Sequence, residues 1–391
     1  MRNKPRIRFK GFTEDWEQCK LSDILKVNSG KDYKHLEQGN IPVYGTGGYM
    51  LSVNESLSKI DAIGIGRKGT IDKPQYLKAP FWTVDTLFYL TALDKHSILF
   101  LYYLMQLIPW KKFDESTGVP SLSKTTIDNI SGFVPSNSKE EELISALFNQ
   151  LDKSITLHQC KLEKLKLAKK ALLQKLFPKN GSQFPEIRFK GFTDAWEQRK
   201  LLTVLNKIVD YRGRTPKKLG LDWSSTGHLA LSALNVKMGY IDKTVDAHYG
   251  DDHLYSVWMK DNDLYEGQVL FTTEAPMGNV AQVPDDNKYI LSQRTIAFVP
   301  DRSVISDNFL AVVLSASKCQ KSLTNRASGG TAKGVSQKTL SEISLDIPQS
   351  LSEQDKVSEL IKKLSKVITL HQCKLDKLQD VKKGLLQKMF V

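Results

Sequence analysis

The sequence predicts a mixed α/β (α+β) fold in which two globular domains are separated by two long antiparallel coiled-coil helices. The two halves are expected to be related by a pseudo-two-fold internal repeat. One leader segment and one long helical segment each occur twice, while the stretches between them share little sequence. With 391 residues, the chain is long enough for two to three domains.

The duplicated leader comes first in each half. Residues 5–21 read PRIRFKGFTEDWEQCKL and residues 185–201 read PEIRFKGFTDAWEQRKL, so 13 of 17 positions are identical at an offset of 180. The parts that follow, 22–117 and 202–330, differ in length and in sequence. This pattern indicates one scaffold that carries two different recognition modules.

The second repeated segment predicts the long helices. Residues 155–177 and 368–390 share 17 of 23 positions, beginning with ITLHQCKL, at an offset of 213. We expect helices over 138–178, with Ser138 as cap and Glu141 at the third helical position, and over 351–391. At about 1.5 Å per residue, each would be roughly 60 Å long.

A heptad pattern runs through both helices, and seven of the nine seam positions are apolar in each. The seam positions are Phe148, Leu151, Ile155, His158, Leu162, Leu165, Lys169, Leu172 and Leu176, then Ile361, Leu364, Ile368, His371, Leu375, Leu378, Lys382, Leu385 and Met389.

Four polar residues interrupt the seam at matching places, and we expect them to set the helix register: His158, Lys169, His371 and Lys382. The connector from Pro178 to Gln183 has about six residues, which favours an antiparallel, hairpin-like path. The neighbouring His-x-Cys pairs do not predict a metal site, because residues i and i+2 do not share a helix face.

Composition restricts the class of protein. The chain has 56 basic and 43 acidic residues, a net charge of +13. Such an excess is typical of nucleic-acid binding or of a lysine-rich solvated surface, and charge alone leaves both open. There is no apolar run of about 18 residues, no secretion signal and no CxxC pair, so we expect a cytoplasmic location and no membrane contact.

The first variable part contains a glycine-rich basic turn. Residues 62–70 read AIGIGRKGT, predicting a strand and then a loop, with further strand and a turn over 70–74. A formal GxGxxG is present, but a dinucleotide site would need a helix next. The turn is either a phosphate- and DNA-binding loop or a purely structural one. The DNA-binding candidates in this part are Lys31, Tyr44, Arg67 and Lys68.

The second variable part has a basic loop over residues 211–218, YRGRTPKK, and further polar loops later in the chain. Side chains of these types contact base edges and phosphates in DNA complexes, although each could equally lie in a solvated loop. The candidates are Arg212, Arg214, Thr215, Lys217, Lys218, Arg294, Arg326 and Lys333.

Motifs for catalysis are missing from the sequence. There is no GxxxxGK[ST] nucleotide loop, no Asn/Asp-Pro-Pro-aromatic tetrapeptide and no GxSxG nucleophile motif. Residues 284–288, PDDNK, are typical of a turn rather than of a nuclease site. We therefore expect a non-enzymatic chain with no catalytic residues and no metal.

The chain resembles the DNA specificity subunit of type I restriction-modification systems. The resemblance lies in the repeated RFKGFTxxWEQxKL leader, the repeated ITLHQCKL helix, the GRTP turn at 213–216 and the EQDK segment at 353–356. The first half departs from it, with EEE at 140–142, and with Ser29, Gly30 and Lys31 near the place of the GxTP turn.

This resemblance implies a domain plan and a set of partners. Residues 1–137 and 179–350 would be target recognition domains, each reading one half of an asymmetric, bipartite double-stranded DNA site, and the helices over 138–178 and 351–391 would fix the gap. Two methylase subunits with S-adenosylmethionine and two ATP- and Mg-dependent restriction subunits would act on the DNA. The chain itself would hold no cofactor.

Two alternatives remain at this level. One is an architectural or regulatory DNA-binding protein whose coiled coil dimerises it, which needs an apolar seam left over for self-association. The other is a cofactor enzyme that uses residues 64–69. The mass of the purified chain would identify the first, and a nucleotide titration the second.

Overall fold

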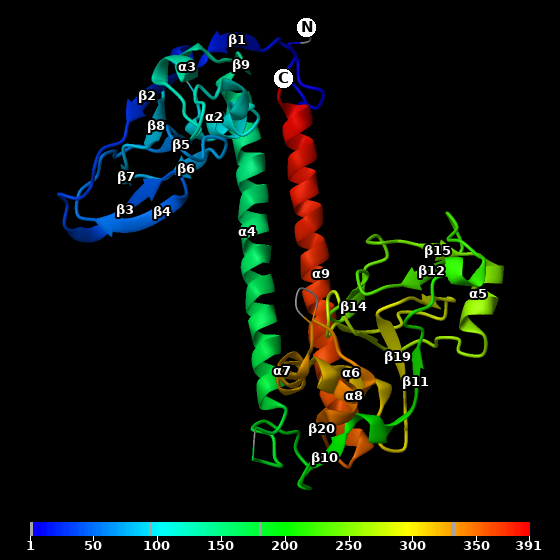
Figure 1. The fold of residues 1–391 in the computed structure, drawn as a ribbon. Coiled ribbons are helices and arrows are strands. Elements are labelled where there is room, and N and C mark those ends of the chain that lie inside the picture. The colour runs from blue at the N-terminus through cyan, green and yellow to red at the C-terminus, as the bar shows by residue number, and fades with distance from the viewer. Residues whose placement is uncertain (1–2, 94–95, 180, 330–332) are drawn as a thin grey trace. The chain divides into compact units, whose positions relative to one another are not determined.

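The protein is described here by a computed structural model covering residues 3–93, 96–179, 181–329 and 333–391 (Figure 1). It has two compact units. Unit 1 comprises residues 1–160 and 372–391, and unit 2 comprises residues 161–371. Strands and short helices form the globular part of each unit, and two long helices follow them, which confirms the predicted mixed fold.

The described residues of unit 1 form three sheets. The leader strand β1 pairs antiparallel with β9, a four-stranded antiparallel sheet has the order β2-β8-β5-β6, and a three-stranded sheet has the order β4-β3-β7 with one parallel pair. The elements are β1 (Glu17–Lys20), α1 (Leu21–Ile24), β2 (Leu25–Ser29), β3 (Gln38–Gly45), β4 (Gly48–Val53), β5 (Ala62–Gly66), β6 (Gln75–Leu77), β7 (Trp82–Thr83), β8 (Leu87–Ala92), α2 (Ile98–Met105), η1 (Trp110–Phe113), α3 (Lys124–Asn129) and β9 (Ser131–Val134).

Unit 2 repeats this plan with a similar leader and with unlike residues in the larger sheets, and it adds a two-stranded sheet of β13 and β14. Its leader strand β10 pairs with β20, its four-stranded sheet has the order β11-β19-β16-β17, and its three-stranded sheet has the order β15-β12-β18. The elements are β10 (Glu197–Lys200), η2 (Leu201–Val204), β11 (Leu205–Asp210), η3 (Pro216–Leu219), β12 (His228–Leu231), β13 (Val236–Lys237), β14 (Tyr240–Ile241), β15 (Tyr249–Gly250), α5 (Asp252–Met259), β16 (Val269–Thr272), β17 (Val280–Gln282), β18 (Ile290–Leu291), β19 (Thr295–Pro300), α6 (Asp307–Ser315), α7 (Ser317–Arg326), α8 (Gln337–Glu342) and β20 (Ser344–Ile347).

The long helices are α4 (Ser138–Lys175) and α9 (Leu351–Met389). All eighteen predicted seam residues lie in the described part of the chain, and every one is buried or half-buried. The heptad prediction is therefore confirmed. Because the seam is covered, it is not left over for the self-association that an architectural, dimerising DNA-binding protein would require.

The start of α4 differs from the prediction. Asn137, not Ser138, precedes the helix, and its side-chain oxygen accepts a hydrogen bond from the Lys139 amide at 3.0 Å. Glu141 makes no capping box, because its carboxylate contacts His96 at 2.7 Å and the Ser97 amide at 2.8 Å. Contacts with His96 and Ser97 therefore replace the capping role that the sequence spacing predicted for Glu141.

The core of unit 1 is closed by the end of α9. The ring of Phe390 lies 5.9 Å from Trp16, 5.2 Å from Phe100 and 5.9 Å from Phe148. The Ile7 amide also donates to the Lys388 carbonyl at 2.9 Å. A leader from the first repeat is therefore packed against a helix end from the second repeat.

Unit 2 shows the reciprocal arrangement. Phe177, just beyond α4, lies 5.5 Å from Trp196 and 5.8 Å from Phe309, and the Ile187 amide donates to the Lys175 carbonyl at 2.9 Å. The core of unit 2 thus takes its leader from the second repeat and its closing aromatic ring from the first.

An ion pair fastens each leader to the start of a long helix. Arg8 contacts Glu140 at 2.6 Å in unit 1, and Arg188 contacts Glu353 at 2.8 Å in unit 2. Both carboxylates are buried in the first turn of their helices, where the positive end of the helix dipole favours an anion.

The two lysines in the seam have different surroundings. Lys382 pairs with Asp152 at 2.7 Å and lies 5.4 Å from the centre of the Tyr103 ring, in unit 1. In unit 2, Lys169 has no such ion pair within the described residues, and burial lowers its pKa. The residue that matches Asp152 at the 213 offset is Ser365, so the second repeat lacks the carboxylate.

We predict that Phe390→Ala destabilises unit 1 by about 3–5 kcal/mol, because the substitution removes a buried ring that touches three others. Hydrogen exchange of the β1 and β9 amides in the full chain would measure the effect. Val381→Ala, on the exposed side of α9, is the matched control and should change stability by less than about 0.5 kcal/mol. Unchanged exchange in Phe390→Ala would contradict this account of the core.

The cysteines give a second prediction. Cys160 and Cys373 are exposed, whereas burial raises the pKa of Cys19 to about 11 and that of Cys319 to about 12. Only the thiolate is nucleophilic, so a raised pKa leaves these two thiols protonated and unreactive at pH 8. A disulfide reagent should modify Cys160 and Cys373 rapidly and Cys319 only after unfolding. Fast native labelling of Cys319, located by peptide mass, would disprove this.

Candidate nucleic-acid interface

A polar cavity of about 470 Å³ lies at one end of the four-stranded sheet in unit 2. It brings together two of the predicted DNA-binding residues, Arg212 after β11 and Arg294 before β19, which are 82 positions apart in the sequence. The whole lining is Arg212, Gly213, Thr273, Glu274, Gln293, Arg294, Ser328, Gly329, Gly334, Val335 and Ser336.

Arg212 is held by its neighbours. Its Nε donates to Asp210 at 3.0 Å and its Nη1 donates to the Val335 carbonyl at 3.3 Å. Burial acts to raise the pKa of Asp210, but the hydrogen bonds and charge of Arg212 outweigh it and hold that pKa below its usual value. The Arg212 side chain is 33% exposed and lines the cavity.

Arg294 forms an exposed ion pair with Glu274, with 2.7 Å between Nε and Oε1. Arg294 and Ala275 both have left-handed backbone conformations, with φ of 65° and 46°. Such conformations are uncommon for residues other than glycine and concentrate at functional sites.

The basic loop over 211–218 divides into supporting and exposed residues. Arg214 donates to the Trp258 carbonyl at 2.9 Å and stacks 4.5 Å from the centre of the Tyr211 ring. Thr215 caps the turn η3 by accepting from the Lys218 amide, and the Lys218 ammonium donates to the Gly213 carbonyl at 2.7 Å. Lys217 is exposed to solvent.

Two further candidates lie outside the lining of this cavity. Arg326 ends α7, where it contacts Glu342 at 3.6 Å and lines a separate cavity of about 930 Å³ that also contains Lys318 and Lys321. Lys333 is exposed beside Gly334. Residues 330–332 of the same predicted loop lie outside the described residues.

In unit 1, three of the candidates come after strands of the sheets. Lys31 follows β2, and its amide donates to the Thr83 carbonyl at 2.8 Å. Arg67 and Lys68 follow β5 and are exposed, with the Arg67 guanidinium 5.8 Å from the centre of the Phe88 ring. Tyr44 is half-buried at the end of β3, 6.5 Å from the ring of Tyr49.

The glycine-rich turn after β5 is not a dinucleotide site. The next element is β6, which starts at Gln75 and pairs antiparallel with β5, so no helix follows the turn. A side chain at Gly66 would lie 2.1 Å from the Thr70 carbonyl oxygen, and Gly69 has φ of 91°. The strand predicted over 70–74 was wrong, because the tight return of the chain leaves no room for extended pairing there.

The sequence-based set of site residues omitted Glu274 and Gln293. Both lie in polar segments that are visible in the sequence, but pairing of Thr272 with Thr295 is what places them side by side. Gln293 also donates to the Arg214 carbonyl, which connects the cavity to the basic loop.

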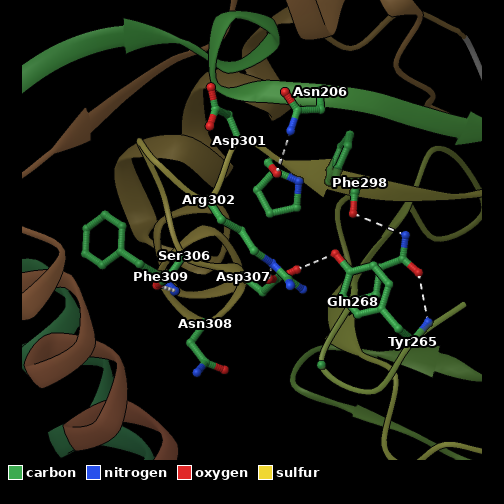
Figure 2. A network of polar contacts seen from close by, with 12 residues as sticks. Asn206, Tyr265, Gln268, Phe298, Asp301, Arg302, Ser306, Asp307, Asn308 and Phe309 are labelled. Atoms are coloured by element: carbon green, nitrogen blue, oxygen red, sulfur yellow. Dashed lines mark hydrogen bonds and ion pairs between the residues drawn. The ribbon is translucent and has the colours of Figure 1, made fainter.

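A second polar cluster in unit 2 is self-contained (Figure 2). Asp307, at the start of α6, accepts from Arg302 at 2.9 Å and from the Tyr265 hydroxyl at 2.7 Å, and Gln268 bonds to the Phe298 carbonyl at 3.4 Å (Figure 2). Burial raises the pKa of Tyr265. Because the charges in this cluster satisfy one another, we assign it a structural role.

In residues 3–93, 96–179, 181–329 and 333–391, no three His, Cys, Asp or Glu side chains are grouped so as to bind a metal ion. Within the same ranges, no helix combines the length and apolarity needed to cross a bilayer.

Comparisons with known proteins identify the family. The family described as the type I restriction modification DNA specificity domain matches residues 13–167 and 253–380. The type I restriction enzyme MjaVIII specificity subunit of Methanocaldococcus jannaschii is 23% identical over 300 residues, which cover 74% of this chain and 68% of that protein.

Solved structures show the same fold. The S subunit of a type I restriction-modification system from M. genitalium has a TM-score of 0.74 and 13% identity, with 99% of both chains covered. A structure described as explaining complex assembly and conformational transition of the type I R-M system has a TM-score of 0.50 and 12% identity, with 96% of this chain and 97% of that chain covered. Since the family match covers more than half of the sequence, this chain belongs to the type I restriction-modification DNA specificity family.

Proposed function

We propose that each unit reads one half of an asymmetric, bipartite DNA site, with a fixed gap between the halves. The observation that carries this proposal is one strand plan with two unlike sets of polar loops at the same end of the four-stranded sheet. A shared frame with different loops suits a protein that must place two readers equivalently and yet read two different sequences.

The loop residues suit both tasks of a DNA-binding surface. Exposed Lys217 and Arg67 can neutralise phosphates, which supplies affinity that falls with salt. Arg212, Glu274, Gln293 and Arg294 have the donors and acceptors that distinguish base edges in the major groove. Arg214 and Thr215 shape the loop from beneath.

The chain is proposed to do no chemistry itself. It would direct adenine methylation and restriction by partners: methylase subunits that carry S-adenosylmethionine, and restriction subunits that use ATP and Mg. A target adenine must leave the base stack to be methylated, which is a task for the methylase rather than for this chain.

The repeated helix segment offers one docking surface in each unit. Leu157 in unit 1 and Leu370 in unit 2 are matching residues of the ITLHQCKL motif, and they are 54% and 61% exposed. An exposed leucine in the same short sequence context on both helices is consistent with two identical partners. We therefore propose two methylase subunits per chain.

The first test is a methylome. The chain would be expressed with its cognate methylase subunit in a host that lacks DNA methylation, and the DNA sequenced with modification-sensitive reads. We expect N6-methyladenine at one bipartite motif with a fixed gap. With a co-purifying, active methylase, the absence of any enriched motif would contradict the proposed function.

Arg212→Ala should weaken or relax one half of that motif and leave assembly with the methylase intact. A lost bidentate base contact costs about 1–3 kcal/mol, so methylation of the affected half-site should fall about tenfold or more. Arg302→Ala is the matched control, since Arg302 also pairs with an aspartate in unit 2 but lies in the self-contained cluster. Equal motifs for Arg212→Ala and the unmodified chain would exclude Arg212 from recognition.

A further inference from the structure

The loop after β5 in unit 1 and the loop after β16 in unit 2 have the same backbone pairing. In unit 1, the Arg67 amide donates to the Thr86 carbonyl at 2.8 Å, and the Leu122 amide donates to the Arg67 carbonyl at 3.0 Å. The next residue, Lys68, forms an isolated antiparallel bridge with Ser121.

Unit 2 shows this pattern again. The Thr273 amide donates to the Arg294 carbonyl at 2.7 Å, and the Val335 amide donates to the Thr273 carbonyl at 2.9 Å. The next residue, Glu274, forms an isolated antiparallel bridge with Gly334. Three backbone interactions therefore identify Lys68 and Glu274 as the same position in the two units.

Sequence alignment does not reveal this match. Lys68 and Glu274 are 206 residues apart, whereas the leaders are offset by 180 and the helices by 213. The equivalence comes from pairing of β5 with β8 and of β16 with β19, where Gly66 faces Leu87 and Thr272 faces Thr295.

The two residues at this position have opposite charge. Lys68 is an exposed cation, and its neighbour across the strand is Thr86. Glu274 is 41% exposed and lies 2.7 Å from Arg294, which takes the place of Thr86. In unit 1 this position holds a hydrogen-bond donor, Lys68. In unit 2 it holds an acceptor, Glu274, with the donor Arg294 beside it.

A carboxylate on a DNA-binding surface requires an explanation, because phosphates repel it. It is favourable there if it accepts a hydrogen bond from a base amino group, as Glu does from cytosine N4, while an arginine beside it offsets its charge. A lysine or arginine donates instead to guanine O6 and N7. A polar cavity lies beside Glu274 and Arg294, and the backbone of Arg294 is left-handed.

We propose that this shared position determines specificity in both units: Glu274, with Arg294 beside it, reads a base that presents an amino group, and Lys68 reads a guanine. This inference rests on the proposed function and adds the residue and the chemical class of base to it. It also implies that reversing the charge at this one loop position changes the half-site sequence that a unit recognises, while the strands and long helices stay the same.

The experiment compares methylomes of the full chain with its methylase. We expect Glu274→Gln and Glu274→Ala to relax one base of one half-site, so that substituted sites gain methylation by about tenfold relative to the original motif. Lys68→Ala should relax one base in the other half-site only. Asp285→Asn is the matched control, because Asp285 pairs with Lys243 at 3.0 Å at similar exposure but outside the cavity, and it should leave the motif unchanged.

The outcomes separate this inference from the proposed function. If the unmodified chain yields no bipartite motif, the proposed function itself is wrong. If it yields one and the Glu274 or Lys68 variants, co-purifying with the methylase, reduce methylation equally at all sites with no base relaxed, these side chains contact phosphates or only position Arg294. That result would overturn the inference and leave the function standing.

Discussion

The rest of the structure depends on one kind of contact, in which a phenylalanine just beyond the long helix of one repeat is buried against the leader of the other repeat. Phe390 completes the core around Trp16, and Phe177 completes the core around Trp196. Neither globular part holds all of its own core, so each needs the long helix of the other repeat. Burial of aromatic rings is among the largest single contributions to stability, so each unit depends on residues from both repeats.

The repeated framework, which is the leaders and long helices, and the variable loops differ in how far their residues recur. The frame residues recur: the leader arginines Arg8 and Arg188 pair with Glu140 and Glu353, because a charge buried at a helix start must be compensated. The variable loops share only the pairing of the strands that flank them, not their residues. Loops at the end of a sheet can change sequence at little cost in core packing, and they carry function for this reason. Two different recognition surfaces can therefore share one scaffold.

Some framework residues differ between the two repeats where a different side chain can make the same hydrogen bond. Glu141 accepts a hydrogen bond from the amide of Ser97, the N-cap residue of α2, and its counterpart Gln354 accepts one from the amide of Ser306, the N-cap residue of α6, at 2.8 Å and 3.0 Å. A carboxylate and an amide both present an acceptor oxygen there. Lys382 has a carboxylate partner and Lys169 has none among the described residues, so the two halves of the seam are not energetically alike.

The sequence by itself determined the elements that depend on local periodicity and duplication: the mixed fold with a repeated framework, the heptad seam, the long helices and the family resemblance. Tertiary structure decided what depends on distant partners. Glu141 does not make the predicted cap, because its carboxylate bonds to the Ser97 amide before α2. The strand β6 begins at Gln75 rather than at Thr70, because the turn at Gly66 is too tight. The match of Lys68 with Glu274 is of the same kind. It follows from hydrogen bonds between strands more than ten residues apart, and no spacing in the chain encodes it.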